Sequence, residues 1–456
     1  MSTHTDAAPT GGATRSGQSI GKIVFASLIG TAVEWYDFFL FGSAAALVFG
    51  EVFFGKIGGT EGTLYAFMTY ALGFLARPLG GIVFGHFGDR VGRKKMLVVS
   101  LLMMGIGTAA IGVLPTYGQI GMAAPVLLVL CRLVQGFAVG GEWGGAVLMA
   151  AEHGRDDQRG FWSSWPQAGV ALGNLLATGV LWVLAAVQSD AAFLAWGWRV
   201  SFLLSAVLVI VGLWVRLSIE ESPVFAESKA ELEARAGQKQ HLPILEVIKR
   251  YPREVLVAMG MRMAENISYY IFTVIVITYA TTYKAIDKPV VLRALLIGAA
   301  IQFFVVPAVG ALSDKVGRRP LYLFGAVGVA VWTFVFFNLV DTKSSTNILL
   351  AVVVGLVLHS FMYAPQAAFF SELFGTSVRY SGASVGYQFA SIFAGALAPI
   401  IALQLLGDVK DGNTFAVGVY VAIASVITIV AVLFAKETRN SSLRHDRVVE
   451  TAPVEA

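Results

Sequence analysis

The chain has 456 residues, of which 56 % are hydrophobic and only 14 % are charged, and its formal net charge is +4. This apolar share lies well above that of soluble domains, so the composition indicates an integral membrane protein and excludes an ordinary soluble domain. The single cysteine, Cys131, excludes an intramolecular disulfide and a cysteine-based zinc or iron–sulfur site.

Twelve runs are apolar enough, and close enough to the roughly 20 residues a bilayer requires, to be predicted as transmembrane helices. In chain order they are 22–51, 62–86, 95–114, 123–150, 160–187, 195–217, 254–283, 290–312, 319–340, 346–371, 380–406 and 413–436. The polar residues 1–21 are expected to form a soluble tail and not a cleaved signal peptide. The stretch 218–253 is expected to be a central loop and 437–456 a second tail, which leaves two six-helix halves, 22–217 and 254–436.

The distribution of Lys and Arg predicts the orientation. If the N-terminus is cytoplasmic, seven of the 33 basic residues fall in outer segments and three within spans, and the remaining 23 fall on the cytoplasmic side. Cytoplasmic segments carry such an excess in membrane proteins, so both termini are predicted to be cytoplasmic.

The two halves repeat a motif. Residues 85–94 read GHFGDRVGRK after the second span, and 310–319 read GALSDKVGRR after the eighth, each position displaced by 225. A second pair of segments, around Glu152 and Arg159 and around Glu372 and Arg379, is displaced by 220. We infer a duplicated six-helix unit.

A loop of the form GxxxDRxGRK, found twice in a twelve-span chain, resembles the major facilitator superfamily. The resemblance implies an all-α integral membrane protein of twelve transmembrane helices, with two six-helix halves related by pseudo-two-fold symmetry. It also implies that the loop residues form networks that hold a cytoplasmic gate shut. Their positions are Gly85, Asp89, Arg90, Gly92, Arg93, Glu152, Arg159, Gly310, Asp314, Lys315, Gly317, Arg318, Glu372 and Arg379. The alternative is that the basic loops only set the topology.

Six further segments resemble one family within this superfamily, the metabolite:proton symporters. They are EWYDFFLFG, FLARPLGG, RLVQG with GGEWGGA, RGFWSSWPQAGVALG, RLSIEESPVF and SELFGTSVRYSGAS. Members carry small carboxylates or zwitterionic osmolytes into bacteria, which implies a multi-pass protein of the bacterial inner membrane.

Two acids in the first span are candidates for proton binding. Glu34 and Asp37 share one helix face, and an ionised side chain at membrane depth is costly unless it is paired or wet. Asp37 lies ~22 Å from the start of the first span, and Arg132 lies ~13 Å from the start of the fourth. The fourth span enters the membrane from the opposite side of a hydrocarbon core about 30 Å thick, so the two side chains reach similar depth. Related sugar symporters have an acid and an arginine in comparable positions. The alternative is a permanent ion pair that joins two helices.

The seventh span carries a polar stripe, Arg262, Glu265, Asn266, Tyr269 and Tyr270, at spacings of three and four residues. Such a stripe is expected to line a cavity in which Arg262 holds an anionic substrate and the tyrosines donate hydrogen bonds. An Arg262–Glu265 pair without a ligand role is the alternative.

Four further side chains receive weaker interpretations. Arg77 could contact a substrate carboxylate, snorkel or pair with Glu34, and Gln388 is a second candidate for substrate binding. For Glu142 we favour a structural or gating role, and for His359 that of a packing residue with a satisfied hydrogen bond. Whether either takes part in coupling stays open.

No GxxxxGK[ST] loop and no ordered nucleophile with its base are present, so neither an ATP-driven pump nor an enzyme is expected. Short basic loops at membrane edges argue against nucleic-acid binding. We predict a transporter of a small anionic metabolite, with protons as the coupling ion, no other cofactor, no metal, no obligatory protein partner and a monomeric state. An osmolyte symporter is the first alternative. The best-known osmosensing members of the family that this chain resembles carry a long C-terminal coiled coil, and the tail after residue 436 has no heptads for one, which disfavours this alternative. An uncoupled facilitator or exporter is the second alternative.

Overall fold

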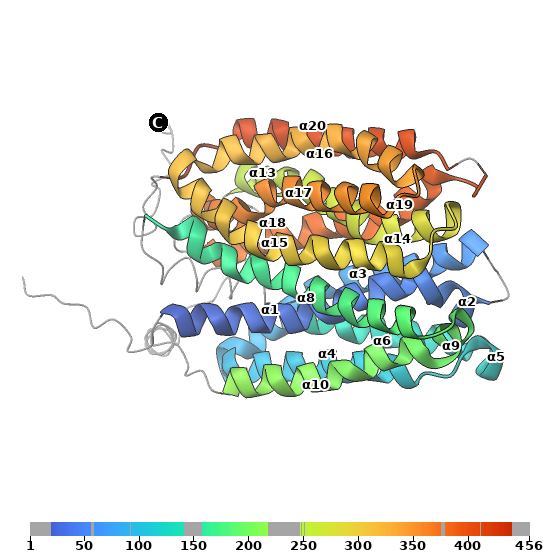
Figure 1. The fold of residues 1–456 in the computed structure, drawn as a ribbon. Coiled ribbons are helices and arrows are strands. Elements are labelled where there is room, and N and C mark those ends of the chain that lie inside the picture. The colour runs from blue at the N-terminus through green and yellow to red at the C-terminus, as the bar shows by residue number, and fades with distance from the viewer. Residues whose placement is uncertain are drawn as a thin grey trace, which may run out of the picture.

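The computed structural model describes residues 20–55, 59–91, 93–140, 157–217, 247, 249, 251–374, 379–410 and 412–439. Within these ranges every regular element is a helix, and the long helices run side by side along one axis of the molecule (Figure 1). Ten helical segments are long and apolar enough to span a membrane, and two shorter apolar stretches, Val98–Val113 and Ala123–Val139, complete the twelve that the sequence predicts.

The first half begins with a composite helix and contains six spans. Their bounds are α1 (Ile20–Ala44) with η1 (Ala45–Phe49) and α2 (Gly50–Phe54); α3 (Gly59–Val91); α4 (Arg93–Val113); α6 (Ala123–Val139); α8 (Arg159–Val187); and α9 (Asp190–Ala192) with η2 (Phe193–Gly197) and α10 (Trp198–Leu217). The four-residue α5 (Tyr117–Ile120) connects the third and fourth spans.

The second half repeats this pattern. Its spans are α13 (Pro252–Tyr270) with η3 (Ile271–Ile275), α14 (Val276–Thr278) and η4 (Tyr279–Tyr283); α15 (Lys288–Val316); α16 (Arg318–Asp341); α17 (Ser345–Leu373); α18 (Arg379–Ala390) with η5 (Ser391–Ala396) and α19 (Leu397–Leu406); and α20 (Thr414–Phe434). The π-helical segments η1 and η3 fall at equivalent places in the first span of each half. π-Helical turns interrupt regular helices and recur at functional sites.

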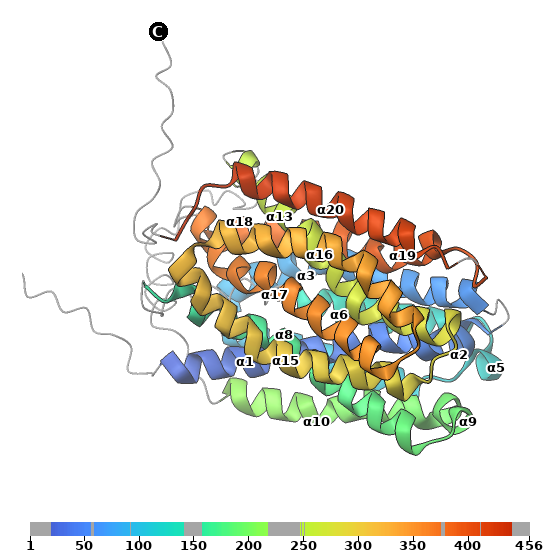
Figure 2. The same cartoon turned by 45° about the horizontal axis from the view of Figure 1, so that its top comes forward.

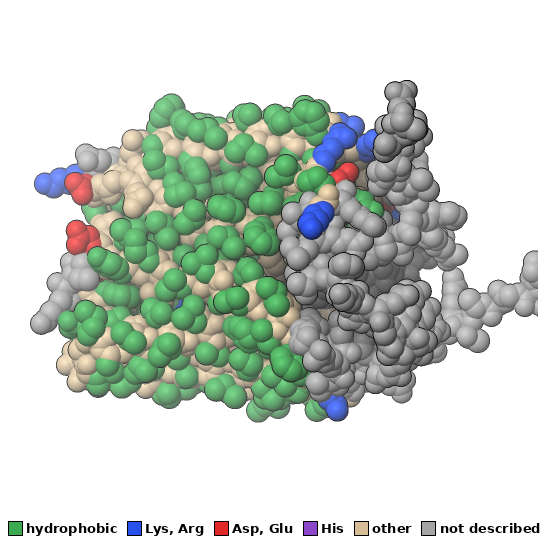
Figure 3. Space-filling model, turned by 180° about the vertical axis from the view of Figure 1, so that it is seen from behind, with side chains coloured by type: hydrophobic (Ala, Val, Ile, Leu, Met, Phe, Trp, Pro, Cys, Tyr) green, Lys and Arg blue, Asp and Glu red, His purple; other side chains and the backbone are tan. Residues whose placement is uncertain are grey.

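The surface separates apolar from charged side chains. On the face drawn in Figure 3, hydrophobic side chains cover the middle of the molecule, and Lys, Arg, Asp and Glu gather toward its two ends. Large apolar side chains such as Trp214, Phe304 and Phe415 are exposed to 70 %, 73 % and 69 %. Exposed apolar area of this extent is stable only in contact with lipid, so the chain is an integral membrane protein.

The halves meet where α8 packs along α15 and where α3 packs on η5 and α19. Within the first half, α1 lies against α8. In the tilted view α10 and α20 lie at opposite edges, with α1, α8 and α15 between them (Figure 2). The start of α1 and the end of α20 lie at the same end of the bundle, as an even number of spans requires (Figure 1).

Candidate functional site

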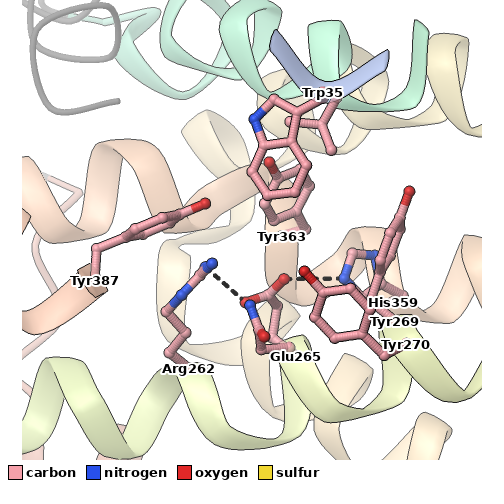
Figure 4. Close-up of a pocket in the computed structure, with 10 residues that line it drawn as sticks. Trp35, Arg262, Glu265, Tyr269, Tyr270, His359, Tyr363 and Tyr387 are labelled. Atoms are coloured by element: carbon pink, nitrogen blue, oxygen red, sulfur yellow. Dashed lines mark hydrogen bonds and ion pairs between the residues drawn. The ribbon is translucent and has the colours of Figure 1, made fainter. Parts of the chain in front are cut away.

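A small cavity lies between the two halves (Figure 4). It encloses about 260 Å³ of space outside atoms, and α1 and α8 of the first half line it together with α13, α17 and α18 of the second. The lining residues are Trp35, Val170, Arg262, Glu265, Asn266, Tyr269, Tyr270, His359, Tyr363 and Tyr387. A charged and aromatic cavity between the halves of a membrane-spanning bundle has the composition of a site for a small polar ligand.

The polar stripe of α13 forms one wall of this cavity. All five of its side chains are buried and line the space, because residues three and four apart project from one face of a helix. Asn174 of α8 donates a hydrogen bond to the Tyr269 hydroxyl across the interface between the halves, at 3.2 Å. The stripe therefore contacts both the cavity and the opposite half.

Arg262 is held in a fixed orientation. Its Nη1 donates to Oε2 of Glu265 at 2.9 Å and to Oε1 of Gln366 at 3.0 Å, and its Nε donates to Oγ of Ser391 at 3.2 Å. The guanidinium also lies over the ring of Tyr387, with Cζ 3.3 Å from the ring centroid. These contacts fix the plane of the guanidinium at the wall of the cavity.

Glu265 is shared between Arg262 and a histidine. Its Oε1 faces Nε2 of His359 at 3.1 Å, while Nδ1 of His359 faces the side-chain amide of Gln302 at 3.1 Å. Gln366 donates to Oε2 of Glu265 at 3.3 Å. His359 is 1 % exposed, and its two ring nitrogens join Glu265 and Gln302 in one buried network.

A second cavity lies inside the first half. It encloses about 180 Å³ and is lined by Glu34, Asp37, Phe38, Met104, Arg132, Gln135 and Val139. Neither carboxylate oxygen of Asp37 has a hydrogen-bond partner among the described residues, and Nη2 of Arg132 has none either. The predicted proton-binding acid and its arginine thus face one cavity without forming an ion pair in this conformation.

The packing of α3 on α6 fixes Arg132. A Cβ at Gly73 would collide with the Arg132 guanidinium, so glycine leaves the room that this side chain fills. Nε of Arg132 donates to the Tyr70 carbonyl at 3.3 Å and Nη1 donates to Oε1 of Gln135 at 3.2 Å. Gln135 in turn donates to Oγ1 of Thr108 at 2.6 Å.

Arg77 and Gln388 lie outside both cavities. Cζ of Arg77 is 4.4 Å from the ring centroid of Phe38 and 4.6 Å from that of Phe74, an arrangement that stabilises a buried cation. Gln388 has its Oε1 buried without a partner, and its neighbour Tyr387 lines the cavity between the halves.

The repeated motif of the second half joins the halves at one end. Both oxygens of Asp314 accept hydrogen bonds from α8, from the backbone N–H of Gly160 at 2.8 Å and of Phe161 at 2.9 Å. Arg318 pairs with Asp314 at 2.7 Å and with Glu372 at 3.3 Å. Arg159 of the first half reaches Oε1 of Glu372 at 3.6 Å.

Other motif residues have simpler places. Gly317 separates α15 from α16 with φ of +111°, a backbone conformation that side chains other than glycine rarely adopt, and Gly310 faces α8. Lys315 occupies the last turn of α15. The side chains of Gly85, Asp89, Arg90, Arg93 and Arg379 lie outside the part that the structure describes, as do residues Gly92, Glu142 and Glu152 altogether.

The segment after α20 completes this end. Glu437 accepts hydrogen bonds from the backbone N–H of Arg318 at 3.0 Å and of Arg319 at 2.9 Å, and so caps the start of α16. Burial by itself would raise the pKa of Glu437, but these and neighbouring backbone donors outweigh it and lower that pKa below its usual value. Thr438 donates to Oε2 of Glu372 at 2.6 Å.

Several residues of the site escaped the sequence analysis. Trp35, Tyr363 and Tyr387 line the cavity, and Gln302 and Gln366 orient its charges. For Gln302 and Gln366, the signal available in the sequence was a polar glutamine inside an otherwise apolar span. Gln302 also stands 225 residues after Arg77, the same displacement that relates Gly310 to Gly85. Among the described residues no group of three His, Cys, Asp or Glu side chains could hold a metal ion.

Comparison with known proteins agrees with this architecture. The chain is 39 % identical over 421 residues to the shikimate transporter of Escherichia coli K12, which covers 92 % of this chain and 95 % of that one. It is 41 % identical over 434 residues to an inner membrane metabolite transport protein of the same organism, with 93 % and 96 % covered. A proline/betaine transporter of Escherichia coli K12 is 33 % identical over 430 residues, with 93 % and 85 % covered.

Solved structures show the same fold. The xylose transporter of Escherichia coli, in a partially occluded inward-open conformation, superposes with a TM-score of 0.70 at 20 % identity, covering 93 % of this chain and 99 % of that one. The family model described as sugar (and other) transporter matches residues 22–448. This protein therefore belongs to the sugar (and other) transporter family of the major facilitator superfamily, and it is a secondary transporter of small molecules and not an enzyme.

Proposed function

We propose that this protein couples proton entry to the uptake of a small organic acid across the bacterial inner membrane. The observation that carries the proposal is Asp37, a carboxyl group that is 2 % exposed, has no hydrogen-bond partner among the described residues and shares a cavity with Arg132. The proposal places both termini in the cytoplasm, following the excess of Lys and Arg on that side.

Asp37 is suited to carry the proton. An ionised carboxylate at membrane depth costs several kcal/mol unless it is paired, so the unpaired side chain in this conformation is best satisfied as the neutral acid. Loss of the proton would leave a carboxylate that Arg132 can neutralise across the shared cavity, since Nη2 of that arginine has no partner among the described residues. Two protonation states thus correspond to two arrangements of α1 against α6.

Arg262 is suited to hold the anion. It lines the cavity between the halves, where its guanidinium can bind a carboxylate. Of the three arginines within spans it is the one that lines this cavity. Tyr269 and Tyr270 lie beside it as hydroxyl partners for a substrate.

Contacts at both ends of the interface suit an occluded state of an alternating-access cycle. Helices α8 and α15 run antiparallel along each other, so Gly160 meets Asp314 at one end and Asp190 pairs with Lys288, at 2.8 Å, at the other. We take residues 22–217 and 254–436 as the two bodies that rock about the cavity. Opening either end would break one set of contacts and keep the other.

A second candidate, symport of a zwitterionic osmolyte, is favoured by the aromatic rings of the cavity. Trp35, Tyr269, Tyr363 and Tyr387 could surround a quaternary ammonium group while Arg262 holds the carboxylate. The relative named as a proline/betaine transporter fits this alternative, and the relative named as a shikimate transporter fits an organic acid.

Uptake by proteoliposomes tests the proposal. Radiolabelled shikimate, 2-oxoglutarate, citrate, proline and glycine betaine are presented with and without an inward proton gradient. Accumulation of a carboxylate driven by the gradient supports the proposal, and accumulation of betaine or proline alone supports the second candidate. Equilibration that ignores the gradient identifies an uncoupled facilitator and overturns proton coupling.

A further inference from the structure

Glu265 stands where a substrate carboxylate would bind. A carboxylate that grips a guanidinium end-on accepts one hydrogen bond from Nη1 and one from Nη2. In the structure both hydrogens of Nη1 are committed, one to Glu265 and one to Gln366. A bidentate substrate therefore has to take over one of these two hydrogen bonds, and the negative charge of a substrate carboxylate repels Glu265 more strongly than it repels the neutral amide of Gln366.

This exchange creates a charge imbalance. Before binding, the charge of Arg262 is balanced by Glu265, which lies 2.9 Å from it. A substrate carboxylate at Arg262 adds a second negative charge to this site. The side chains of Arg262, Glu265 and His359 are each at most 3 % exposed. Buried charge without compensation is strongly unfavourable, so binding of the anion raises the affinity of the cluster for a proton.

His359 is placed to accept that proton. Its Nε2 faces Oε1 of Glu265 and its Nδ1 faces the amide of Gln302. With neutral His359, Nε2–H donates to Glu265 and Nδ1 accepts from Nε2 of Gln302. With protonated His359, the proton on Nδ1 needs an acceptor, which Oε1 of Gln302 supplies after rotation of the amide, and that oxygen has no partner in the described structure.

Among the residues that the structure describes, no other group near Glu265 competes for the proton. The remaining titratable side chains that face it are tyrosines of four different helices, which are neutral where histidine titrates. They are Tyr269, Tyr322, Tyr363 and Tyr387. Glu265 and His359 therefore account for the ionisable response of this site, together with the fixed charge of Arg262.

We propose that His359 is a second proton-binding site, which takes up a proton when a substrate carboxylate displaces Glu265 from Arg262. This proposal rests on the proposed function, because it requires an anionic substrate, but it adds a proton carrier distinct from Asp37. Binding of the substrate anion thereby draws a compensating proton to His359, separately from the proton at Asp37.

Proton uptake on ligand binding tests the proposal with the purified full chain. The probe is shikimate, with 2-oxoglutarate in parallel, titrated calorimetrically in two buffers of different ionisation enthalpy between about pH 6 and 8, where histidine titrates. The background is Asp37→Asn, which removes the first proton site. We expect on the order of one proton taken up per shikimate, and a linked loss of affinity of about tenfold per pH unit above the titration of the pair.

His359→Gln and Glu265→Gln are each added to that background. Both are expected to bind the probe with no proton uptake and with an affinity that no longer depends on pH, since the first lacks the acceptor and the second lacks the excess negative charge. Two variants protect the test if one does not fold. Thr333→Ala is the matched control and keeps the proton, because the Thr333 hydroxyl bonds the Val329 carbonyl of its own helix α16 and the residue lines neither cavity.

Binding to Asp37→Asn without proton uptake overturns the second site, as does uptake that survives both substitutions. These results leave the proposed function standing, because gradient-driven accumulation by the unmodified protein is measured separately. Failure of the unmodified protein to bind or accumulate either acid overturns the proposed function and this inference with it.

Discussion

Asp37 and Arg262 occupy equivalent positions in the two halves, since the 225 residues that separate them also separate Gly85 from Gly310. The first span of the first half thus carries a carboxyl group where the first span of the second half carries a guanidinium cation. Each borders its own cavity. Opposite charges at one position of a repeat are what a proton-and-anion transporter needs, because one half can bind the cation and the other the anion.

Replacing Asp37 by Asn is expected to abolish accumulation against a gradient and to spare exchange of labelled for unlabelled substrate. The amide is nearly isosteric with the protonated acid, so the occluded state persists, but it cannot release a proton. Counterflow and gradient-driven uptake in proteoliposomes distinguish the two activities. Glu51→Gln, at an exposed carboxylate of α2, is the matched control. Accumulation that survives in Asp37→Asn would remove this side chain from the coupling mechanism.

Arg262→Lys is expected to weaken the apparent affinity for the transported acid by about tenfold or more, because an ammonium group cannot give a bidentate grip. It also cannot keep the three partners, Glu265, Gln366 and Ser391, that orient the guanidinium. Concentration dependence of uptake measures the loss. Arg293→Lys, at an exposed arginine without a described partner, should leave the affinity unchanged. An unaltered affinity in Arg262→Lys would place the anion elsewhere.

The stripe of α13 was predictable from the sequence because polar residues at helical spacing in an apolar span indicate a helix face that lines a cavity. The partners of that stripe were not. Gln302, His359 and Gln366 come from α15 and α17, and only the packing of those helices on α13 brings them to Glu265 and Arg262. The sequence also placed Asp37 and Arg132 at similar depth, but whether they pair depends on the conformation.

At the scale of helices, glycine sets how closely α8 and α15 approach. A Cβ at Gly310 would meet the Ser164 side chain and the Gly160 carbonyl, and a Cβ at Gly160 would meet Gly310 in return. Small residues at such crossings allow backbones to pack directly against each other in membranes. This contact lies beside Asp314, so it controls the register of the interface between the halves.

Gly310→Ala is expected to destabilise the protein by about 1–3 kcal/mol, since the added methyl overpacks a crossing that has no room. Thermal unfolding of the detergent-solubilised protein, followed by tryptophan fluorescence, measures the effect. Gly118→Ala is the matched control, because a Cβ there meets only Oγ1 of Thr116 at 3.8 Å. Equal melting temperatures for the two variants would show that α8 and α15 separate without cost.

Glu437→Ala should cost about 1 kcal/mol of stability, as for loss of an N-cap, because α16 then begins with unsatisfied N–H groups. Since the pKa of Glu437 is lowered on folding, its contribution is present above the unfolded pKa of about 4.3 and is lost as the pH falls through the folded value. Melting temperatures at neutral and acidic pH should therefore converge for the unmodified protein and the variant. Lys436→Ala, at an exposed lysine, should melt like the unmodified protein at both pH values.

The helix boundaries were largely predictable, because apolar length and flanking charge determine them. The predicted fifth span, 160–187, compares with α8 at Arg159–Val187, and the predicted ninth, 319–340, compares with α16 at Arg318–Asp341. Local breaks were not predictable. The π-helical segments η1 and η3 contain no proline or glycine that would mark them, so they arise from packing between helices.

At the scale of the molecule, the two ends of the interface differ in strength. At one end Asp190, whose side chain is 83 % exposed, pairs with Lys288, and exposed pairs contribute little. At the other, the partly buried Asp314 and the buried Glu372 bind backbone and arginine donors from both halves. The contacts therefore favour opening at the Lys288 end when no ligand is bound.

Asp314→Asn is expected to shift the protein toward opening at the end where the Asp314 and Glu372 network joins the halves. The amide can accept only one of the two hydrogen bonds from Gly160 and Phe161, and it loses the charge that pairs with Arg318. Ser164 reports on this opening, because it is fully buried and faces Gly310 across the interface. With Cys131 replaced by Ser, a cysteine introduced by Ser164→Cys becomes the only thiol in the chain.

We expect maleimide to label that thiol several-fold faster in Asp314→Asn than in the parent protein, and shikimate, if transported, to slow the labelling by favouring the occluded state. Asp190→Asn in the same background is the control, because it weakens the opposite end and should leave Ser164→Cys protected. Equal rates in all three proteins would mean that the Asp314 network stabilises the fold without gating it. Faster labelling in Asp190→Asn alone would reverse the assignment of the stronger gate. The Asp190–Lys288 pair would then control access of maleimide to Ser164→Cys from the opposite end of the interface.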